Sequence, residues 1–326
     1  GGKGKRAANL REEDFVRWLF VANTHDHVLF LTDAGKVYLK KVYEIPSSSR
    51  TGRGRHVNNF VGLDPKEEAL ATILALETLD TEDAFLLTVS RNGKVKRTAL
   101  SAYANIRANG LIAVQIEEGD QLLTARLVRE DDEVLLGTAD GMSIRFKVSD
   151  ARAMGRDTRG VRGIALAEGD RVVGMDVVED EQEQQVLAVS ANGYGKRTPV
   201  SEWRIQGRGG KGIIAMVTSE RNGPLVKLRL VRPSEQIMVV TNGGQIIRTH
   251  VEQIREAGRN TQGVRVIRVA ADERVVDVEP LTEEDELEEG EADELEASTE
   301  EPEAGPPEPA DDEAPDDGDA DDDADG

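Results

Sequence analysis

Short apolar runs separated by glycine-containing turns recur along most of this chain. Each run has four or five residues, ends at Asn-Gly, Asp-Gly or a similar pair, and leads into a second segment that carries basic residues. Asn-Gly and Asp-Gly favour tight hairpin turns because both central positions need a positive φ. The pattern therefore predicts five β-hairpins, whose first strands and turns occupy the segments 28–35, 85–93, 134–141, 186–193 and 237–244.

A second glycine unit repeats in phase with the hairpins. In this unit a polar or basic residue precedes a glycine, and a β-forming segment follows. The six glycines are Gly4, Gly54, Gly110, Gly160, Gly212 and Gly263, at steps of 50, 56, 50, 52 and 51 residues. Gly-Asp turns and a last apolar strand complete several of the repeats. Four short strands in about 50 residues are typical of one propeller blade, so the chain is predicted to be an all-β repeat array.

The distribution of charge divides the chain into two regions. Residues 280–326 hold 24 Asp and Glu and no Lys or Arg, whereas residues 1–279 hold 41 basic and 39 acidic residues. The net charge of −22 therefore arises at the end of the chain, and the body is near +2. A segment so acidic and so poor in large apolar residues cannot offset the entropy of ordering. We predict a β-domain over residues 1–279 and a disordered acidic tail over residues 280–326.

The sequence lacks the residue signatures of several functional classes. The chain has no cysteine, which excludes a disulfide framework and a thiolate metal site. His25 and His27 can share a strand face, but without further ligands they do not predict a metal site. The longest apolar runs are far below the roughly 20 residues of a spanning helix, and no secretory signal is visible. We predict no catalytic residue, no metal and no cofactor in this chain.

Basic residues occupy two recurring positions in the repeat. One set follows the hairpin turns, where residues two apart share a strand face. That set is Lys36, Lys40, Lys94, Lys96, Arg97, Arg145, Lys147, Lys196, Arg197 and Arg248. The other set lies on or near the glycine unit and comprises Lys3, Lys5, Arg6, Arg50, Arg53, Arg55, Arg107, Arg152, Arg156, Arg159, Arg162, Arg204, Arg208, Lys211, Arg255, Arg259 and Arg265.

Equal spacing along the chain puts these cations at the same point of each repeat. A closed or spiral array would gather them into a basic band around its rim, which is the electrostatic signature of a surface that binds a polyanion. Single Lys and Arg residues on β-edges also prevent edge-to-edge aggregation, or are simply solvated. Solubility alone does not require the same position every time, so the set as a whole favours a polyanion.

The glycine unit is most complete in the heptad Gln-Gly-Arg-Gly-Gly-Lys-Gly at 206–212, and the last four letters of this heptad also open the chain. A P-loop is excluded because it needs four residues between its first glycine and Gly-Lys, and then Ser or Thr. What remains is a loop whose backbone amides can approach a phosphate, or a bulge where strands cross between blades. The candidate residues are Gln206, Arg208, Gly209, Gly210, Lys211 and Gly212, with Gly1, Gly2, Lys3 and Gly4 at the start of the chain.

The heptad resembles the gyrase A box, whose usual form is Gln-Arg-Arg-Gly-Gly-Lys-Gly, with Gly207 in place of the first arginine. The stretches 21–27, 152–155, 161–164, 192–198 and 258–263 are similar to the same family. Residues 1 to about 280 thus resemble the C-terminal domain of the DNA gyrase A protein. An acidic tail is also typical of some gyrases.

The resemblance implies a six-bladed β-pinwheel, in which neighbouring blades exchange strands. It also implies that double-stranded DNA wraps around the basic rim without sequence preference, so that strand passage by the enzyme core introduces negative supercoils. The implied partners are the gyrase A N-terminal domain and the gyrase B protein, in an A2B2 enzyme of the bacterial cytoplasm associated with the nucleoid. The isolated domain is expected to be a monomer.

The start of the chain has its own interpretation within this resemblance. Because the principal box of the family lies in the first blade, residues 1–4 look like the end of that box. The chain is then expected to be a fragment with an incomplete first blade and without the catalytic tyrosine.

Alternatives stay open at this point. The C-terminal domain of topoisomerase IV, which chiefly selects DNA geometry, has a similar repeat but usually a degraded box. A protein-interaction propeller would present aromatic anchors, and only 4% of this chain is aromatic. The acidic tail either mimics DNA and occupies the basic rim, or serves only solubility.

Overall fold

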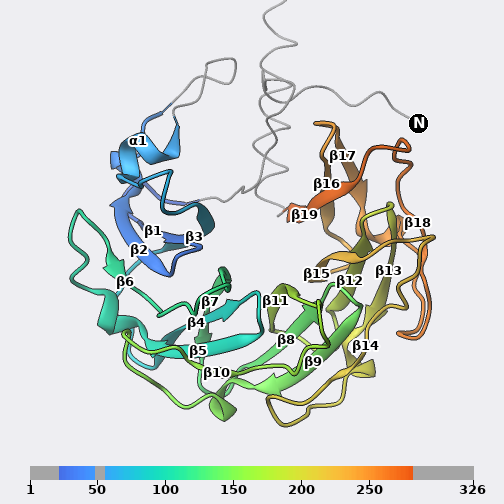
Figure 1. The fold of residues 1–326 in the computed structure, drawn as a ribbon, viewed down its shortest axis with the longest axis horizontal. Helices are drawn as coiled ribbons and strands as arrows, with labels where there is room; N and C mark the ends of the chain where they lie inside the picture. The colour runs from blue at the N-terminus through green and yellow to red at the C-terminus, as the bar shows by residue number, and fades with distance from the viewer. Residues whose placement is uncertain (1–21, 48–55, 282–326) are drawn as a thin grey trace, which may run out of the picture. The chain divides into compact units, whose positions relative to one another are not determined.

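All five predicted hairpins are present in the structure, a computed structural model that describes residues 22–47 and 56–281 (Figure 1). Each hairpin turn contains a glycine with φ between 76° and 83°, as the turn chemistry predicts. The paired strands are β1 (His27–Thr32) with β2 (Lys36–Lys41), β4 (Ala84–Ser90) with β5 (Lys94–Ala99), β8 (Glu133–Thr138) with β9 (Met142–Lys147), β12 (Gln185–Ser190) with β13 (Tyr194–Pro199), and β16 (Gln236–Thr241) with β17 (Ile246–His250).

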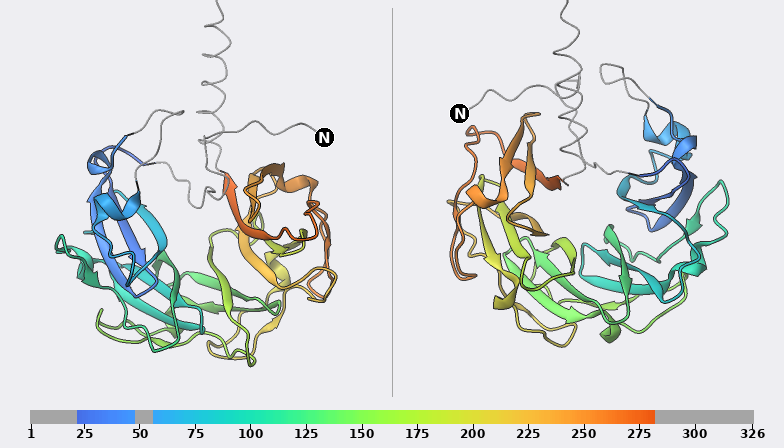
Figure 2. Two further views of the ribbon diagram at one scale, coloured as in Figure 1. Left: turned by 45° about the horizontal axis from the view of Figure 1, so that its top comes forward. Right: turned by 180° about the vertical axis from the view of Figure 1, so that it is seen from behind.

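A third strand runs antiparallel to the first strand of each hairpin. The third strands are β3 (Leu70–Leu76), β7 (Leu122–Arg129), β11 (Val172–Val178), β15 (Leu225–Val231) and β19 (Val275–Leu281). Consecutive third strands contact each other from β3 through to β19, and they lie on the inner side of the sheets in both views of Figure 2. Strand β19 includes Pro280 and Leu281, so the β-domain extends two residues beyond the predicted boundary. The rest of the predicted tail lies outside the described residues.

A short fourth strand reaches each of the first four sheets from the next repeat. These donated strands are β6 (Leu111–Ile112), β10 (Val161–Arg162), β14 (Ile213–Ile214) and β18 (Val264–Arg265). They pair with β2, β5, β9 and β13, respectively. We name the sheets by their strand orders: sheet A is β3-β1-β2-β6, sheet B is β7-β4-β5-β10, sheet C is β11-β8-β9-β14, sheet D is β15-β12-β13-β18, and sheet E is β19-β16-β17. The expected exchange of strands between neighbouring blades is therefore present.

The number of blades differs from the expected six. Residues 22–47 and 56–281 form five, of which sheets A to D have four strands and sheet E has three. The sixth repeat expected from the sequence falls in residues 1–21, outside the described residues.

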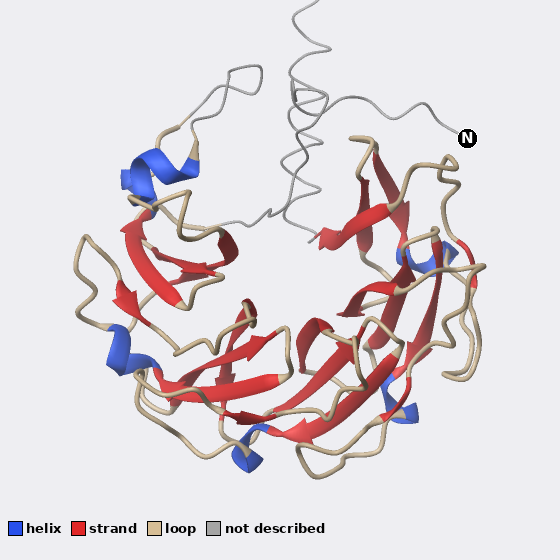
Figure 3. Cartoon of the chain, in the orientation of Figure 1, coloured by secondary structure: helices blue, strands red, loops and turns tan. Residues whose placement is uncertain are grey.

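Short helical turns follow the second hairpin strands, as Figure 3 shows. They are the 3-10 helices η1 (Val42–Glu44), η2 (Leu100–Tyr103), η3 (Val148–Asp150), η4 (Val200–Glu202) and η5 (Val251–Gln253). One α-helix, α1 (Val57–Val61), lies between β2 and β3. The helical turns end the hairpins and direct the chain toward the preceding sheet.

The hydrophobic core is divided into layers between neighbouring sheets. In strand β4, Leu86 belongs to the layer shared with sheet A and Leu87 to the layer shared with sheet C, and both are fully buried. Successive side chains of a strand point to opposite faces, so the first hairpin strands are covered on both. This explains why their sequences are continuous apolar runs.

Candidate nucleic-acid interface

Four loops that carry the glycine unit cross from one sheet to the preceding one. We call them the rim loops; they span residues 104–110, 152–160, 204–212 and 255–263, between a 3-10 helix and the following donated strand. Three rim loops make one parallel backbone bridge to the second hairpin strand of the preceding sheet: Ala153 to Arg97, Ile205 to Arg145, and Glu256 to Arg197. Equivalent sequence positions are therefore held at equivalent points in space.

The last glycine of each rim loop lies against the preceding sheet, at the Tyr38 ring for Gly110 and at backbone carbonyls for the other three. Gly110, Gly160, Gly212 and Gly263 have φ between 72° and 82°. A Cβ on Gly212 would lie 2.1 Å from the carbonyl oxygen of Ser143, and one on Gly160 would lie 2.5 Å from that of Val95. No side chain fits at such distances, and a positive φ disfavours any L-residue there. The glycines thus have the crossing role considered from the sequence.

Neighbouring rim loops are joined by hydrogen bonds. The amide of Ala165, just after donated strand β10, donates to the carbonyl of Gly210 in the next rim loop at 2.9 Å. Gln115 donates to Thr158, and Val217 donates to Thr261, at 3.0 Å in each case. The four rim loops therefore form one continuous row.

The predicted box, residues 206–212, is held at several points along its length. The amide of Gln206 donates to the carbonyl of Arg145 at 2.8 Å, and that of Gly209 donates to the carbonyl of Gly163 at 2.7 Å. Gly210 is exposed and accepts the bond from Ala165 described above. The box is thus a fixed loop that lies across two sheets.

Arginines at one position of the rim loops connect each loop to its neighbour. The Arg208 guanidinium donates to the carbonyl of Arg162 in β10 at 2.5 Å. Arg156 donates in the same way to Ile112 in β6 at 3.4 Å, and Arg259 donates to Ile214 in β14 at 3.0 Å. All three side chains are partly exposed, so they fix the loops and still present positive charge at the surface.

Exposed cations occur along this row of loops. Lys211 and Arg204 belong to the box loop, and neither makes an ion pair within residues 22–47 and 56–281. Arg159 is exposed and lies 3.8 Å from Glu117, and Arg265 donates to the Tyr194 hydroxyl at 3.0 Å. The other exposed predicted cations are Arg107, Lys147, Arg152, Arg162, Arg248 and Arg255, of which Arg248 donates to Gln236. These side chains are the best candidates for contacts with a polyanion.

Two lysines predicted for the rim surface are instead buried. The exposed fractions of Lys96 and Lys196 are 1% and 0%. The Lys96 ammonium donates to the carbonyls of Ala113 at 2.7 Å, Gly155 at 3.0 Å and Arg156, and the Lys196 ammonium donates to Gly258 at 2.7 Å and to Arg259. Burial lowers the pKa of both lysines to about 8. These lysines hold the next rim loop to the sheet, so we withdraw them from the surface that a ligand could contact.

Three arginines at the equivalent position of β5, β9 and β13, four residues after the turn glycine, are also largely internal. Arg97 pairs with Glu130 at 3.2 Å and lies over the Phe85 ring. Arg145, with an exposed fraction of 3%, pairs with Glu133 at 2.6 Å and Glu181 at 3.0 Å.

Arg197 is the third of them, and its side chain is largely covered. It donates to the Gln185 side chain at 2.7 Å and to the carbonyl of Ile254 at 2.6 Å. The prediction that Arg97, Arg145 and Arg197 face a ligand is corrected in the same way, because their charges are satisfied inside the protein.

The predicted lysines nearest the hairpin turns are half-buried. Lys36 lies 3.6 Å from Glu68, and Lys94 lies 2.5 Å from Glu117. The hydrogen bond from Lys94, with the charges of Lys94 and Arg159, lowers the pKa of Glu117 below its ordinary value. Lys40 is also partly exposed. Gly1, Gly2, Lys3, Gly4, Lys5, Arg6, Arg50, Arg53 and Arg55 lie outside the described residues.

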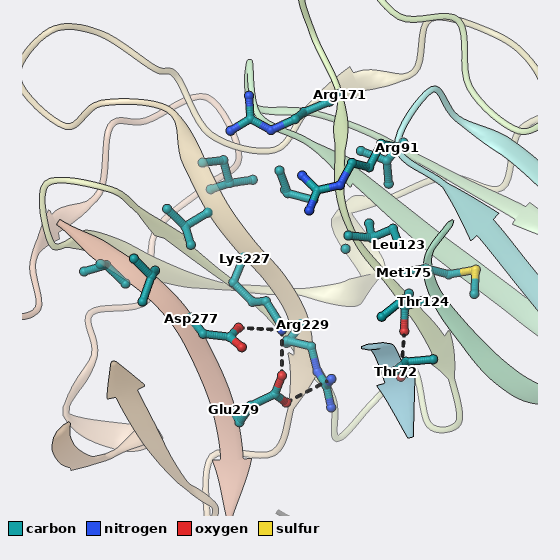
Figure 4. Close-up of a pocket in the computed structure, with 18 of the residues that line it drawn as sticks. Thr72, Arg91, Leu123, Thr124, Arg171, Met175, Lys227, Arg229, Asp277 and Glu279 are labelled. Atoms are coloured by element: carbon teal, nitrogen blue, oxygen red, sulfur yellow. Dashed lines mark hydrogen bonds and ion pairs between the residues drawn. The ribbon is translucent and has the colours of Figure 1, made fainter. Parts of the chain in front are cut away.

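An ionic cluster that the sequence reasoning missed lies between the third strands. Figure 4 shows it at the wall of a cavity of about 750 Å³ that residues of β3, β7, β11, β15 and β19 line. Lys227 lies 2.7 Å from Asp277 and 2.6 Å from Glu279, and Arg229 lies 3.2 Å from Glu279 and 3.1 Å from Asp176.

Asp176 lies at the centre of that cluster and also pairs with Arg126 at 3.3 Å. Burial alone would raise the pKa of Asp176, but the charges of Arg229 and Arg126 bring it below its ordinary value. The visible signal was a charged residue inside four of the five apolar third strands, all except β3. Its partners lie about 50 residues away in sequence, on strands that only the array brings together.

The described residues contain no candidate metal site and no candidate membrane-spanning helix. In the part of the chain that the structure describes, no group of three or more His, Asp or Glu residues is arranged to hold a metal ion. Within the same ranges, no helix has the length and apolar character needed to cross a bilayer.

The structure is a β-propeller whose blades exchange strands. Its rim is cationic, because the row of rim loops carries exposed Lys and Arg side chains. The chain belongs to the family described as DNA gyrase C-terminal domain, beta-propeller, which matches residues 1–23, 26–76, 84–129, 132–179, 184–232 and 235–282. Five of these segments contain the hairpins of sheets A to E, and the sixth is 1–23.

Similar proteins agree with this assignment. The DNA gyrase A protein of Staphylococcus epidermidis is 44% identical over 286 residues, which are 88% of this chain and 32% of that protein. The DNA gyrase A protein of Staphylococcus aureus is 45% identical over the same lengths, so the chain spans about a third of these relatives.

Two solved structures are similar across most of the chain. A DNA gyrase A C-terminal domain superposes with a TM-score of 0.69 at 27% identity, covering 80% of this chain and 84% of that one. The C-terminal domain of DNA topoisomerase IV gives a TM-score of 0.74 at 25% identity, covering 85% of each.

Proposed function

We propose that this chain binds double-stranded DNA along its rim loops and wraps it, as the C-terminal part of a DNA gyrase A protein. The observation that carries this proposal is the row of exposed cations on loops that hydrogen bonds join end to end. Lys211 and Arg204 in one loop, and Arg152 and Arg159 in the preceding one, occupy adjacent segments of that row. DNA presents a regular row of phosphates, which such an arrangement can follow over several blades.

The energy needed to bend DNA favours many phosphate contacts over a few base contacts. Bending a site of 20–30 base pairs by 40–90° costs on the order of 1–6 kcal/mol. Each neutralised phosphate releases counterions and contributes about −0.9 to the slope of log affinity against log salt. Distributed cations can therefore offset the bending energy without reading bases, and the proposed binding is independent of DNA sequence.

The finer features of the family are part of the same proposal. Residues 1–21 contribute to a sixth blade, and Gly1, Gly2, Lys3 and Gly4 form the end of a first box, with 206–212 as a second. Binding by this chain supports negative supercoiling only within the whole type IIA topoisomerase, as an A2B2 enzyme in the bacterial cytoplasm. The chain itself contributes no catalytic residue and no cofactor.

A second candidate is selection of DNA geometry, as expected from the sequence for a topoisomerase IV C-terminal domain. The observation in its favour is the TM-score of 0.74 to such a domain. The nearly intact box at 206–212 supports wrapping instead. A protein-interaction role has less support, because Tyr43 is the one aromatic among the exposed large hydrophobic side chains of the described residues.

The experiment that tests this proposal is a salt titration of DNA binding by the double variant Arg204→Gln/Lys211→Gln. Both side chains are exposed, so the fold should not change. We expect weaker binding at low salt and a log–log slope reduced by about 0.9 for each lost phosphate contact. Arg171→Gln is the matched control, since Arg171 is exposed but lies at the cavity rather than on a rim loop (Figure 4). An affinity that is flat between low and physiological salt would contradict the proposal.

A further inference from the structure

The cavity between the third strands has the size and lining of a site for a small molecule. Its volume is about 750 Å³, and all five third strands contribute to its wall. Ligand sites usually measure roughly 300–1,000 Å³ and combine mostly apolar walls with a few polar groups. Duplex DNA does not fit into such a space, and the strands that line it lie on the inner side of the sheets (Figure 2). Its occupant is therefore distinct from the DNA proposed for the rim.

Each third strand has a bulge at its second residue, and all five bulge residues line the cavity. The pairing with the hairpin skips that residue in every sheet, as it does between Val172 and Gly174 in β11. A bulge turns a side chain away from the regular alternation, and bulges are frequent next to active sites. The bulge residues are Ala71, Leu123, Val173, Val226 and Val276.

The bulge residues are apolar and nevertheless accessible. None of the five is buried, whereas Leu122, Val172, Leu225 and Val275, which precede four of them, are buried. Accessible apolar surface that polar groups surround marks a binding site. The bulges thus present an apolar wall to a ligand instead of adding it to the core.

The ionic cluster lies next to the bulge residues along the strands, and its charges balance. Its three cations pair with its three carboxylates: Arg126, Lys227 and Arg229 with Asp176, Asp277 and Glu279. Burial and the neighbouring Arg229 nevertheless lower the pKa of Arg126, so this side chain experiences a positive potential. Any further arginine in the wall adds to that potential.

Arg171 supplies such a charge directly before β11. It is exposed, lines the cavity, and makes no ion pair and no side-chain hydrogen bond within residues 22–47 and 56–281. Arg91 lines the cavity beside it, since the Val172 amide donates to the Arg91 carbonyl at 2.9 Å. Figure 4 shows both guanidinium groups on one side of the cavity, away from Asp277 and Glu279. The two arginines therefore form a cationic end of the site.

A phosphate monoester is the anion that suits two neighbouring guanidinium groups. It carries a charge of about −1.5 to −2 at pH 7 and offers three strong acceptor oxygens. The planar fork of arginine binds such oxygens through two parallel hydrogen bonds. Because a guanidinium has several N–H donors, Arg91 can bind a phosphate and keep other bonds within the protein.

We propose that the cavity binds a small organic phosphate, whose phosphate group pairs with Arg171 and Arg91 and whose apolar body contacts the bulge residues. The side chains of the ionic cluster can hydrogen-bond polar groups of the same ligand. This site needs neither DNA nor a rim loop, so it goes beyond the proposed function.

Calorimetric titration of the full chain with adenosine 5′-monophosphate tests the proposal. This probe joins a phosphate monoester to an aromatic base, and adenosine and inorganic phosphate are the matched controls because each lacks one of these parts. We expect saturable binding of the monophosphate and binding of each control that is weaker by about tenfold or more. No saturable binding of the monophosphate, or equal binding of either control, overturns the proposal.

Variants locate the phosphate group. Arg171→Gln should weaken binding of the monophosphate by about tenfold or more, because a hydrogen bond to a charged group is lost. Arg171→Lys keeps the charge but not the fork, so its affinity should lie between those of Arg171→Gln and the unchanged chain. Arg204→Gln/Lys211→Gln alters only the rim and should bind the monophosphate as the unchanged chain does. Loss of binding in the rim variant with retention in Arg171→Gln would place the anion on the rim and overturn the proposal.

Val276→Trp tests the apolar wall. The exposed fraction of Val276 is 37%, so a larger side chain narrows the cavity without entering the core. We expect weaker binding of the monophosphate, and an unchanged affinity would contradict the proposed location. DNA binding should be the same in Val276→Trp, Arg171→Gln and the unchanged chain. A failure of this site would therefore leave the function proposed for the rim standing.

Discussion

Residues of the same type have different roles here according to their position in the repeat. Lys211 is exposed on a rim loop, whereas Lys196 is fully buried and donates to carbonyls of the next loop. The glycines divide in the same way. Gly212 lies against the backbone of Ser143, whereas a Cβ on Gly207 would meet nothing within 4 Å. Position relative to the preceding sheet decides each case.

The two glycines of the box give the first prediction at this scale. Gly212→Ala should lower the free energy of unfolding by about 1–3 kcal/mol, the order of cost for a non-glycine residue in a strained conformation. Its φ is +73° and its Cβ would lie 2.1 Å from the Ser143 carbonyl oxygen. Gly207→Ala is the matched control and should stay within about 0.5 kcal/mol of the unchanged chain. Urea unfolding measures both. Equal stabilities for the two variants would show that the loop crosses the sheet by another path.

At the scale of elements, the rim loops 152–160 and 255–263 are each held at three points. A parallel bridge begins the loop, a buried lysine grips its middle, and a glycine ends it against the preceding sheet. In sheets B and D the grip is the ammonium of Lys96 or Lys196. The loops are therefore fixed by the sheet that precedes them, which suits a surface whose charges must keep a constant spacing.

Lys196→Met tests that grip. The substitution leaves the carbonyls of Gly258 and Arg259 without their donor, and we expect the free energy of unfolding to fall by about 1–3 kcal/mol. Lys147→Met, at an exposed site, is the control and should change it by less than about 0.5 kcal/mol. If both variants unfold at the same urea concentration, the ammonium contributes nothing net to stability.

The same variant should also change the pH dependence of stability. Burial lowers the pKa of Lys196 from 10.5 to about 8, so between these values the unfolded chain binds more protons than the folded one. The free energy of unfolding therefore gains a contribution that rises with pH over this window. That rise should be smaller in Lys196→Met than in Lys147→Met, and an identical pH profile would contradict it.

Hairpins, turn glycines and the repeat length could be predicted from the sequence, because each depends on local chemistry. Asn192 and Gly193 specify a turn wherever they occur between apolar runs. The burial of Lys196, three residues after that turn, could not be predicted, because the carbonyls around it come from residues about 60 positions later. Because side chains alternate along a strand, Lys196 and Arg197 point to opposite faces. The alternation does not predict which of the two faces the next rim loop covers.

At the scale of the whole domain, the sheets are connected by exchanged strands on one side and by ion pairs between third strands on the other. Donated strands link each of sheets A to D to the sheet that follows it. Asp176 in sheet C pairs with Arg126 in sheet B and Arg229 in sheet D. The blades from sheet B to sheet E are therefore fixed relative to each other at both edges, and the cations of successive rim loops keep their order.

Wrapping by this row of cations is the central claim, and DNA topology tests it most directly. A nicked circular plasmid is ligated in the presence of the chain, and the linking number is measured after the protein is removed. We predict a positive shift that grows with the amount of chain bound and decreases for Arg204→Gln/Lys211→Gln but not for Arg171→Gln. A chain that binds the plasmid yet leaves the linking number unchanged, or shifts it to negative values, would contradict wrapping.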